Sequence, residues 1–256
     1  MVMFSDRAEV SGSDVCRELS ARWPSLTAPT EIDAKENIAS FSIGSAMVFL
    51  APMPAPIPWS DLEGPCATSL LWKNAAQEVK RHQQHLLVTI FGELDPIEYS
   101  TLLTQVTAAV LAASPSSIGV YWGGATLVIP KPIFIDFAME VLAEGPPLHI
   151  WVDFRVGSES DQTSSGFTAG MTALGHMELE AKNTPEAPGE LRERLMGLAG
   201  YLLDKGPVIK NGDTIGEDAN ERIRVVYSKS AFGHDGQVMR LEYGPTSKQK
   251  PWWKMW

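Results

Sequence analysis

Hydrophobic and polar residues along this chain follow two periods, near two and near 3.6 residues, and therefore predict an alternation of strands and helices. Strands are predicted at 37–43, 46–50, 86–91, 118–122, 125–129, 148–156, 177–181, 208–210, 213–215, 223–228 and 238–243. Helices are predicted at 13–23, 69–81, 95–113, 132–144 and 191–205. Turn residues support two hairpins, around Gly44-Ser45 and around Asn211-Gly212, because Gly and Asn adopt the backbone angles that tight turns need.

Residues 86–122 predict one β-α-β unit. Leu86–Phe91 is a continuous apolar run, typical of a strand buried on both faces. The helix after Asp95-Pro96 carries one apolar stripe, and Ile118–Trp122 returns as a strand. A right-handed crossover that joins two parallel strands is the expected arrangement.

The segment 148–156 alternates cleanly and predicts a strand with one apolar and one polar face. The polar face carries His149, Trp151, Asp153 and Arg155. The next nine residues, GSESDQTSS at 157–165, contain no apolar anchor and predict a polar, mobile loop.

These elements predict an α+β fold, a single compact domain over 1–256 with a mixed, mostly antiparallel sheet, one β-α-β crossover and covering helices. A version with two lobes divided near residue 84 or 185 is the alternative. Residues 244–256 form a tail that ends in PWWKMW. Because an unpaired aromatic segment invites aggregation, the tail is expected to dock on an apolar patch, with contact to a partner or a membrane surface as the alternative.

Composition narrows the function classes. With 256 residues and 44% hydrophobic content, the chain can bury a full core without a metal or disulfides. Its net charge of −10 argues against direct nucleic-acid binding, which needs a concentrated basic surface. Two distant cysteines, Cys16 and Cys66, no basic-apolar leader and no apolar run long enough to span a bilayer favour a cytoplasmic protein.

Catalytic and metal-binding signals are weak. The histidines include His82 and His85, but a predicted helix end and strand start separate these two, so their spacing does not converge them on a metal. No G-x-S-x-G motif occurs, and the near miss at 166–170 follows a loop instead of a strand. His149 and Asp153 lie about 13 Å apart along an extended strand, too far for direct contact. No catalytic residue, metal site or cofactor is therefore predicted.

Three segments carry a family resemblance: HLLVTIFGELDP (85–96), GVYWGGATLVIP (119–130) and YLLDKGPVIKNGDTIG (201–216). Over roughly residues 84–243 the chain resembles a bacterial family catalogued only as a domain of unknown function, and residues 1–83 lie outside the resemblance. Some members of that family are encoded beside type VI secretion toxins, which implies an immunity (antitoxin) protein. The implied partner is a cognate toxin, and the acidic charge of this chain fits a basic one such as a nuclease.

Charge alone selects the candidate contacts of such a partner. They are the acidic residues of two clusters, Glu159 and Asp161 in the first and Glu217, Asp218 and Glu221 in the second. Two alternatives remain open. One is a non-enzymatic scaffold or interaction protein of a secretion system, and the other is a hydrolase or transferase that uses the face of His149 and Asp153. The sequence leaves the oligomeric state undetermined.

Overall fold

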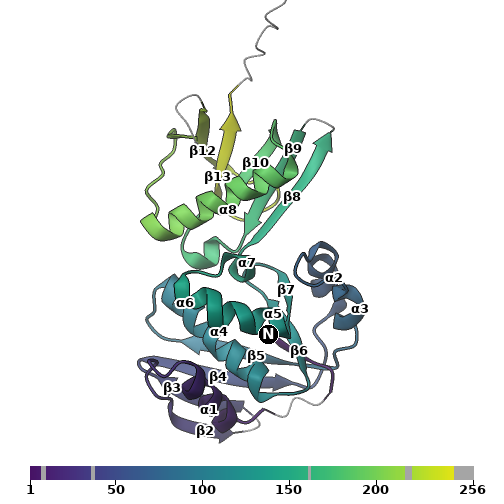
Figure 1. Cartoon of the computed structure of the whole chain (residues 1–256), viewed down its shortest axis with the longest axis vertical. Coiled ribbons are helices and arrows are strands. Elements are labelled where there is room, and N and C mark those ends of the chain that lie inside the picture. Colours follow the sequence, from purple (N-terminus) through teal and green to yellow (C-terminus); the bar gives the residue numbers. More distant parts are fainter. Residues whose placement is uncertain (7–9, 36–37, 161–162, 217–220, 245–256) are drawn as a thin grey trace, which may run out of the picture. The chain divides into compact units, whose positions relative to one another are not determined.

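The computed structural model describes residues 1–6, 10–35, 38–160, 163–216 and 221–244, and it divides the chain into two compact units (Figure 1). Unit 1 comprises Met1–Asp153 and Ala173–Gly175, and unit 2 comprises Phe154–Thr172 and the residues from His176 onward. The boundary lies inside the strand predicted at 148–156, and not near residue 84 or 185. Both units combine helices with mostly antiparallel strands, which confirms the predicted α+β class.

Unit 1 contains a seven-stranded sheet in the order β2-β3-β4-β5-β1-β6-β7, and every pair in it is antiparallel. The strands are β1 (Val2–Phe4), β2 (Thr30–Lys35), β3 (Ile38–Ile43), β4 (Ala46–Met53), β5 (Gln84–Phe91), β6 (Ser117–Trp122) and β7 (Leu127–Pro130). The hairpin predicted around Gly44-Ser45 is confirmed, because Ile43 pairs with Ala46.

The predicted β-α-β unit is present, but its two strands are not neighbours. β5 and β6 run parallel to each other because each is antiparallel to β1, which lies between them. The sequence reading gives residues 2–4 no strand, since three residues are too short to show a period. All three side chains are fully buried. Removing their apolar surface from water stabilises the strand in this central position.

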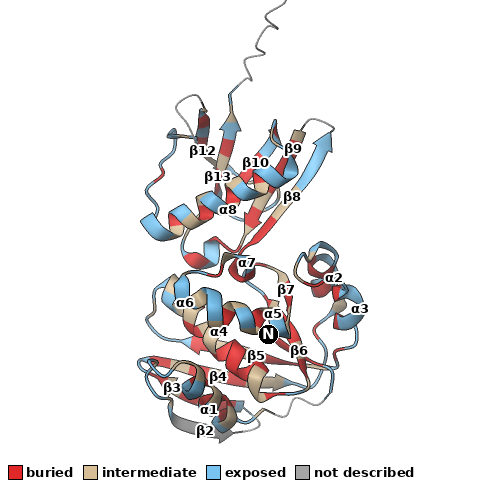
Figure 2. Cartoon of the chain, viewed as in Figure 1, coloured by how far each residue is buried: buried red, intermediate tan, exposed pale blue. Residues whose placement is uncertain are grey.

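Unit 1 also contains helices, several of which pack against its sheet (Figure 2). They are α1 (Gly12–Arg22), α2 (Trp59–Thr68), α3 (Ala75–Val79), α4 (Pro96–Ala113), α5 (Lys131–Asp136), a π-helical stretch (Phe137–Val141), α6 (Leu142–Glu144) and α7 (Leu148–Trp151). The start of α4 confirms the prediction at Asp95-Pro96. Asp95 Oδ1 accepts hydrogen bonds from the N–H groups of Ile97 and Glu98 at 2.8 and 2.9 Å, and the Glu98 carboxylate accepts one from the N–H of Asp95.

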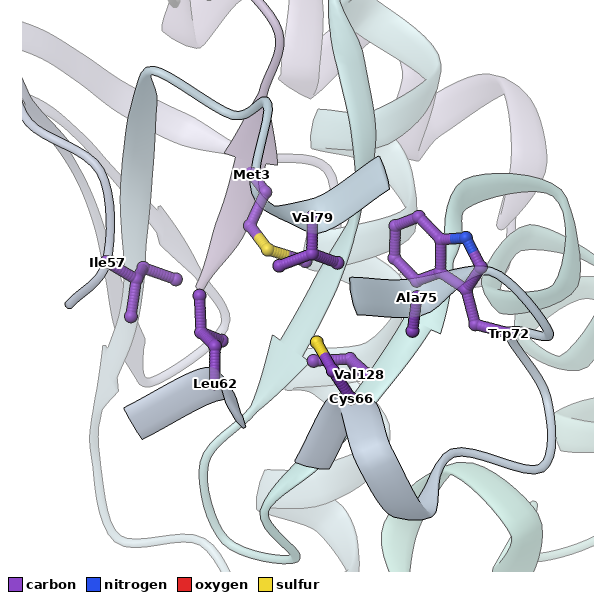
Figure 3. Packing of buried hydrophobic residues seen from close by; sticks show 8 residues of the cluster. All are labelled: Met3, Ile57, Leu62, Cys66, Trp72, Ala75, Val79 and Val128. Atoms are coloured by element: carbon purple, nitrogen blue, oxygen red, sulfur yellow. The ribbon is translucent and has the colours of Figure 1, made fainter. Parts of the chain in front are cut away.

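The single helix predicted at 69–81 is only partly present, because α3 covers Ala75–Val79 alone, and a second short helix, α2, lies before the predicted segment. α2 and α3 contribute to a cluster of buried apolar side chains beside the sheet. Its members are Met3, Ile57, Leu62, Cys66, Trp72, Ala75, Val79 and Val128 (Figure 3). Trp72 Nε1 also donates a hydrogen bond to Glu78 Oε2 at 3.0 Å. The sequence reading misses α2 because its apolar stripe is weak and Pro65 lies inside it.

The strand predicted at 148–156 is wrong in its first half. Leu148–Trp151 form one helical turn after Pro147, and the strand β8 begins only at Asp153. In this turn the Trp151 side chain is buried, with only 1% of its surface exposed. Its Nε1–H donates a hydrogen bond to Thr104 Oγ1 at 2.8 Å. The burial of a large aromatic ring whose N–H is hydrogen-bonded stabilises the helical turn more than the alternating local sequence stabilises a strand.

Unit 2 contains a six-stranded sheet in the order β11-β12-β13-β10-β9-β8. Its strands are β8 (Asp153–Ser160), β9 (Thr163–Ala169), β10 (Leu179–Thr184), β11 (Thr214–Ile215), β12 (Ile223–Lys229) and β13 (Gln237–Tyr243). A short 3-10 helix covers Thr172–Leu174, of which Ala173 and Leu174 belong to unit 1. β10 runs parallel to β13, whereas β9 with β10, β11 with β12 and β12 with β13 are antiparallel.

The polar loop predicted at 157–165 is wrong, because residues on both sides of 161–162 belong to strands β8 and β9. Small hydroxyl side chains replace the missing apolar anchor. Ser164 is buried and donates to the carbonyl oxygen of Glu186 at 2.8 Å, and Thr168 is buried and donates to Glu178 Oε2 at 2.7 Å. A buried polar strand is stable when its hydroxyl groups are paired.

One helix of unit 2, α8 (Pro188–Lys205), packs against β9 and β10. Its buried residues recur at spacings of three and four and form one apolar stripe: Leu191, Leu195, Ala199 and Leu202. Gly206 follows with φ of 78°, a conformation that favours glycine and ends the helix at Lys205, where the helix predicted at 191–205 also ends. None of the described helices combines the length and the hydropathy that a membrane-spanning segment requires.

Gly119 of β6 provides a test of packing in unit 1. A Cβ atom there would lie 2.5 Å from the carbonyl oxygen of Ile129 and 2.6 Å from the Trp72 ring. We expect Gly119→Ala to lower the free energy of unfolding by about 2–3 kcal/mol, because strand β7 or Trp72 must move. Urea unfolding followed by circular dichroism measures the change.

Gly123→Ala is the matched control, since nothing lies within 4 Å of the position its Cβ would take. Its effect should stay within about 0.5 kcal/mol. Equal midpoints for the two variants would contradict the close approach of β6, β7 and Trp72.

Candidate functional site

An open groove of about 660 Å³ lies in unit 2 between α8 and the segment Val208–Gly216, and we call it the α8 groove. The helix contributes Glu193, Arg194, Gly197, Leu198 and Tyr201 to its wall. The segment contributes Val208, Ile209, Asp213, Thr214, Ile215 and Gly216. The volume falls within the range of about 300–1,000 Å³ that is usual for ligand sites.

The register of the helix places both charged and apolar side chains on the α8 wall and leaves the wall open. Its stripe through Leu191, Leu195 and Leu202 faces the sheet, which leaves Leu198 and Tyr201 on the side of the groove. Gly197 adds no side chain, and nothing lies within 4 Å of where its Cβ would be. Tyr201 is 48% exposed and Val208 is 47% exposed, and no other large hydrophobic side chain among the described residues of unit 2 is as exposed.

The opposite wall is held in place by polar contacts to β12. The backbone N–H of Lys210 donates to Asp213 Oδ2 at 2.7 Å, and the N–H of Tyr227 donates to Asn211 Oδ1 at 2.9 Å. The Tyr227 hydroxyl donates to the carbonyl oxygen of Ile209. These contacts confirm the turn at Asn211-Gly212 and give Asp213 the turn-stabilising role that its position indicates.

The hairpin predicted from 208–210 to 213–215 is wrong, because Val208–Lys210 forms no strand. β11 pairs instead with β12, through Thr214 with Arg224 and Ile215 with Ile223. Gly212 has φ of 92°, so the turn forms, but it leads the chain across to β12 rather than back on itself. β11 is consequently an edge strand of the sheet, beside α8.

A partly buried ion network lies at one end of the groove, where Arg194 lines the wall. Arg194 Nε donates to Glu186 Oε1 at 2.5 Å, and Arg194 Nη2 donates to Glu221 Oε1 at 2.7 Å. Burial by itself would lower the pKa of the Arg194 guanidinium, but the hydrogen bond and charge of Glu186 outweigh burial and raise it. The pKa of the Tyr243 hydroxyl is raised above its usual value, mainly by burial and secondly by the negative charge of Glu186.

Two further carboxylates of unit 2 are buried and hold loops. Glu178 accepts hydrogen bonds from the backbone N–H groups of Gly170 and Thr172 at 2.9 and 3.0 Å, besides its bond to Thr168. Glu180 accepts from Ser230 Oγ and from the N–H of Ala231. Their hydrogen bonds account for both groups as parts of the scaffold.

The acidic candidates chosen from charge fall in different places. Glu221 belongs to the ion network at the end of the α8 groove, and Glu159 is exposed on β8. Asp161, Glu217 and Asp218 lie outside the described residues. The structure therefore brings one of the five, Glu221, to the groove.

The face formed by His149, Trp151, Asp153 and Arg155 does not exist as a sheet face. His149 lies on α7 with its ring edge-on to Phe137, and Trp151 points into the core of unit 1. Asp153 is 8% exposed at the start of β8, and Arg155 lies over the Phe167 ring. The arrangement on which the hydrolase alternative depends is absent from the described structure.

The remaining histidines and cysteines of unit 1 have structural surroundings. His82 Nε2 accepts from the N–H of Ile57 at 2.8 Å, and His85 Nδ1 bonds the carbonyl oxygen of Ala55 at 2.8 Å. Burial lowers the pKa of His85 and raises the pKa of the Cys16 and Cys66 thiols to about 11. Within the described ranges, no three His, Cys, Asp or Glu side chains gather as a metal site would require.

Residues 167–242 match a family described as Domain of unknown function (DUF4261). The match includes α8, β11 and the whole α8 groove, while residues 84–166 of the resemblance stated above lie outside it. No curated protein matches the chain, and no solved structure does.

Sequence reasoning missed Tyr201 and Val208 as site residues. Both lie in the segment 201–216 that carries the family resemblance, and Tyr201 is an aromatic residue off the leucine stripe of its helix. A large apolar residue on the polar side of an amphipathic helix is the signal that could have pointed to the groove.

Arg194 provides the test of the site's framework, because its side chain is only 15% exposed and bridges two carboxylates. We expect Arg194→Ala to lower the free energy of unfolding by about 2–4 kcal/mol, since Glu186 would stay buried without its cation. Arg192→Ala, two positions earlier on α8, is the control and should change it by less than about 0.5 kcal/mol. Urea unfolding of both variants measures these changes. Equal unfolding midpoints for Arg194→Ala and Arg192→Ala would contradict a stabilising role of the ion network.

Proposed function

We propose that this chain is a non-enzymatic immunity (antitoxin) protein that binds a cognate bacterial toxin of a type VI secretion system through the α8 groove. The observation that carries the proposal is the groove itself, an open channel between a helix and an edge strand that is lined by both apolar and charged side chains. The resemblance of residues 201–216 to a family with immunity members supplies the biological setting.

The shape of the groove suits an extended peptide segment. A free sheet edge can add a strand through main-chain hydrogen bonds, while a helix beside it offers pockets for alternate side chains. β11 is such an edge, and Leu198 and Tyr201 of α8 face the channel beside it. Tyrosine is among the residues that most often dominate the energy of protein interfaces.

Charge favours a basic toxin, of which a nuclease is one example. The chain carries a net charge of −10, and both Glu193 and Asp213 line the groove. Opposite charge accelerates encounter and makes association sensitive to salt. Glu159, Asp161, Glu217 and Asp218 stay candidate contacts on the ground of their charge alone.

Co-expression with the product of a neighbouring toxin gene tests this function. Rescue of growth and co-purification of a complex with a Kd in the nanomolar range or below, weakening with added salt, are the expected results. We expect Tyr201→Ala to weaken binding by about 10- to 100-fold, because the ring would be the main apolar anchor in the groove.

Leu70→Ala is the matched control, because Leu70 is a large apolar residue, 71% exposed, on unit 1. It should leave affinity unchanged. Growth rescue by Tyr201→Ala at wild-type affinity would place the toxin elsewhere on the chain. A complex with structural secretion proteins in place of a toxin would favour the scaffold function.

A further inference from the structure

We propose that unit 1 binds a small uncharged aromatic molecule that carries a hydroxyl or N–H group, in a pocket of its own. The pocket has a volume of about 330 Å³, and all of its lining residues belong to unit 1. We call it the α4 pocket, because Tyr99, Ser100, Leu103 and Thr107 of helix α4 form one of its walls. The proposal goes beyond the immunity function and is independent of it, since other residues carry it and no toxin is needed.

Two buried hydroxyl groups of α4 are available to a bound molecule. Ser100 is 4% exposed and Thr107 is 2% exposed, and both residues line the pocket. Neither hydroxyl makes a hydrogen bond to another described residue, whereas the hydroxyl of Thr104, on the same helix, donates to the carbonyl oxygen of Ser100 at 2.7 Å. Buried hydroxyl groups in proteins are nearly always hydrogen-bonded. A polar atom of a bound molecule would supply the partner that Ser100 and Thr107 lack.

Aromatic side chains form much of the remaining lining. Trp122 and Trp151 are buried, and Tyr99 and Tyr121 are half-buried. The Trp151 Nε1–H is already bonded to Thr104, so the ring offers apolar surface alone to the pocket. Another ring packs well against such surface, because aromatic pairs are favourable beyond the area that they bury.

The lining selects an uncharged molecule. None of the described residues in the wall is Asp, Glu, Lys, Arg or His. Met1 also lines the pocket, and its amino group donates to the carbonyl oxygen of Tyr121 at 2.9 Å. Burial lowers the pKa of this amino group to about 5, so it is uncharged at pH 7. A charged molecule would therefore lose its hydration without meeting an opposite charge.

The entrance of the pocket is made of residues with little or no side chain. Gly123, Gly124 and Ala173 are the exposed residues of the lining. A Cβ atom at Gly124 would lie 3.3 Å from the Cβ of Ala173, so a side chain at position 124 would narrow the entrance. The volume is at the lower end of the range of about 300–1,000 Å³ for ligand sites, which fits a molecule of one or two rings.

Isothermal titration calorimetry of the full chain with 2-naphthol, without any partner, tests the proposal. We expect a Kd on the order of 0.1 mM, as the usual ligand efficiency for a molecule of this size implies. 2-Naphthoate has the same two rings but carries a carboxylate. It should bind at least about tenfold more weakly, because its charge would be desolvated without compensation.

The variant Thr107→Val keeps the shape of the side chain and removes its hydroxyl. Its affinity for 2-naphthol should fall about five- to tenfold, the effect of one hydrogen bond, while its urea unfolding midpoint should not fall. Thr101→Val is the matched control, because Thr101 lies on the same helix outside the lining, and it should leave the Kd unchanged. Gly124→Val, which places a side chain at the entrance, should abolish measurable binding.

Absence of binding at a 2-naphthol concentration of about 1 mM overturns the proposal. Equal affinities of Thr107→Val and Thr101→Val also overturn it, because the probe would then bind elsewhere. Equal affinities for 2-naphthol and 2-naphthoate overturn the assignment to an uncharged molecule. Binding that is weakened by Thr107→Val, lost in Gly124→Val and kept in Thr101→Val supports the proposal, whether or not a toxin binds the α8 groove.

Discussion

The guanidinium of Arg194 ties together the segments from which the site of unit 2 is made. It reaches from α8 to Glu186, just before the helix, and to Glu221, just before β12, and it lies near Tyr243 at the end of β13. Removing these charges from water is costly, and only the full set of contacts offsets that cost. The spacing between α8 and the sheet edge, and hence the width of the groove, follows from this one interaction.

The parts of the fold that sequence reasoning predicts well are those with local causes. The capping box of α4, the Gly44 turn and the glycine end of α8 each depend on residues within four positions of one another. Features of this kind can be predicted from the local sequence, without knowledge of the rest of the chain. The predictions that fail depend on distant partners.

Three failures share this origin. β1 is a strand because it pairs with β5 and β6 on its two sides. Leu148–Trp151 is helical because Trp151 donates a hydrogen bond to Thr104 in the core. The strands around 161–162 form because Glu178 and the carbonyl oxygen of Glu186 satisfy buried hydroxyl groups. The α8 groove likewise joins a helix and a turn segment whose approach no local period reveals, although Tyr201 and Val208 lie in the segment that carries the resemblance.

The central place of β1 has a consequence for how the polypeptide assembles. Its three residues are synthesised before the strands that flank them, because their hydrogen-bonding partners in β5 and β6 lie about 80 to 120 positions later in the chain. At a synthesis rate of about 5–20 residues per second, this apolar triplet waits on the order of 10 s for the strands that cover it. The hairpin β3–β4 can form from neighbouring residues in the meantime. Closure of the sheet around β1 is then a late event with long sequence separation, the kind of step that slows folding and lengthens the exposure of apolar surface.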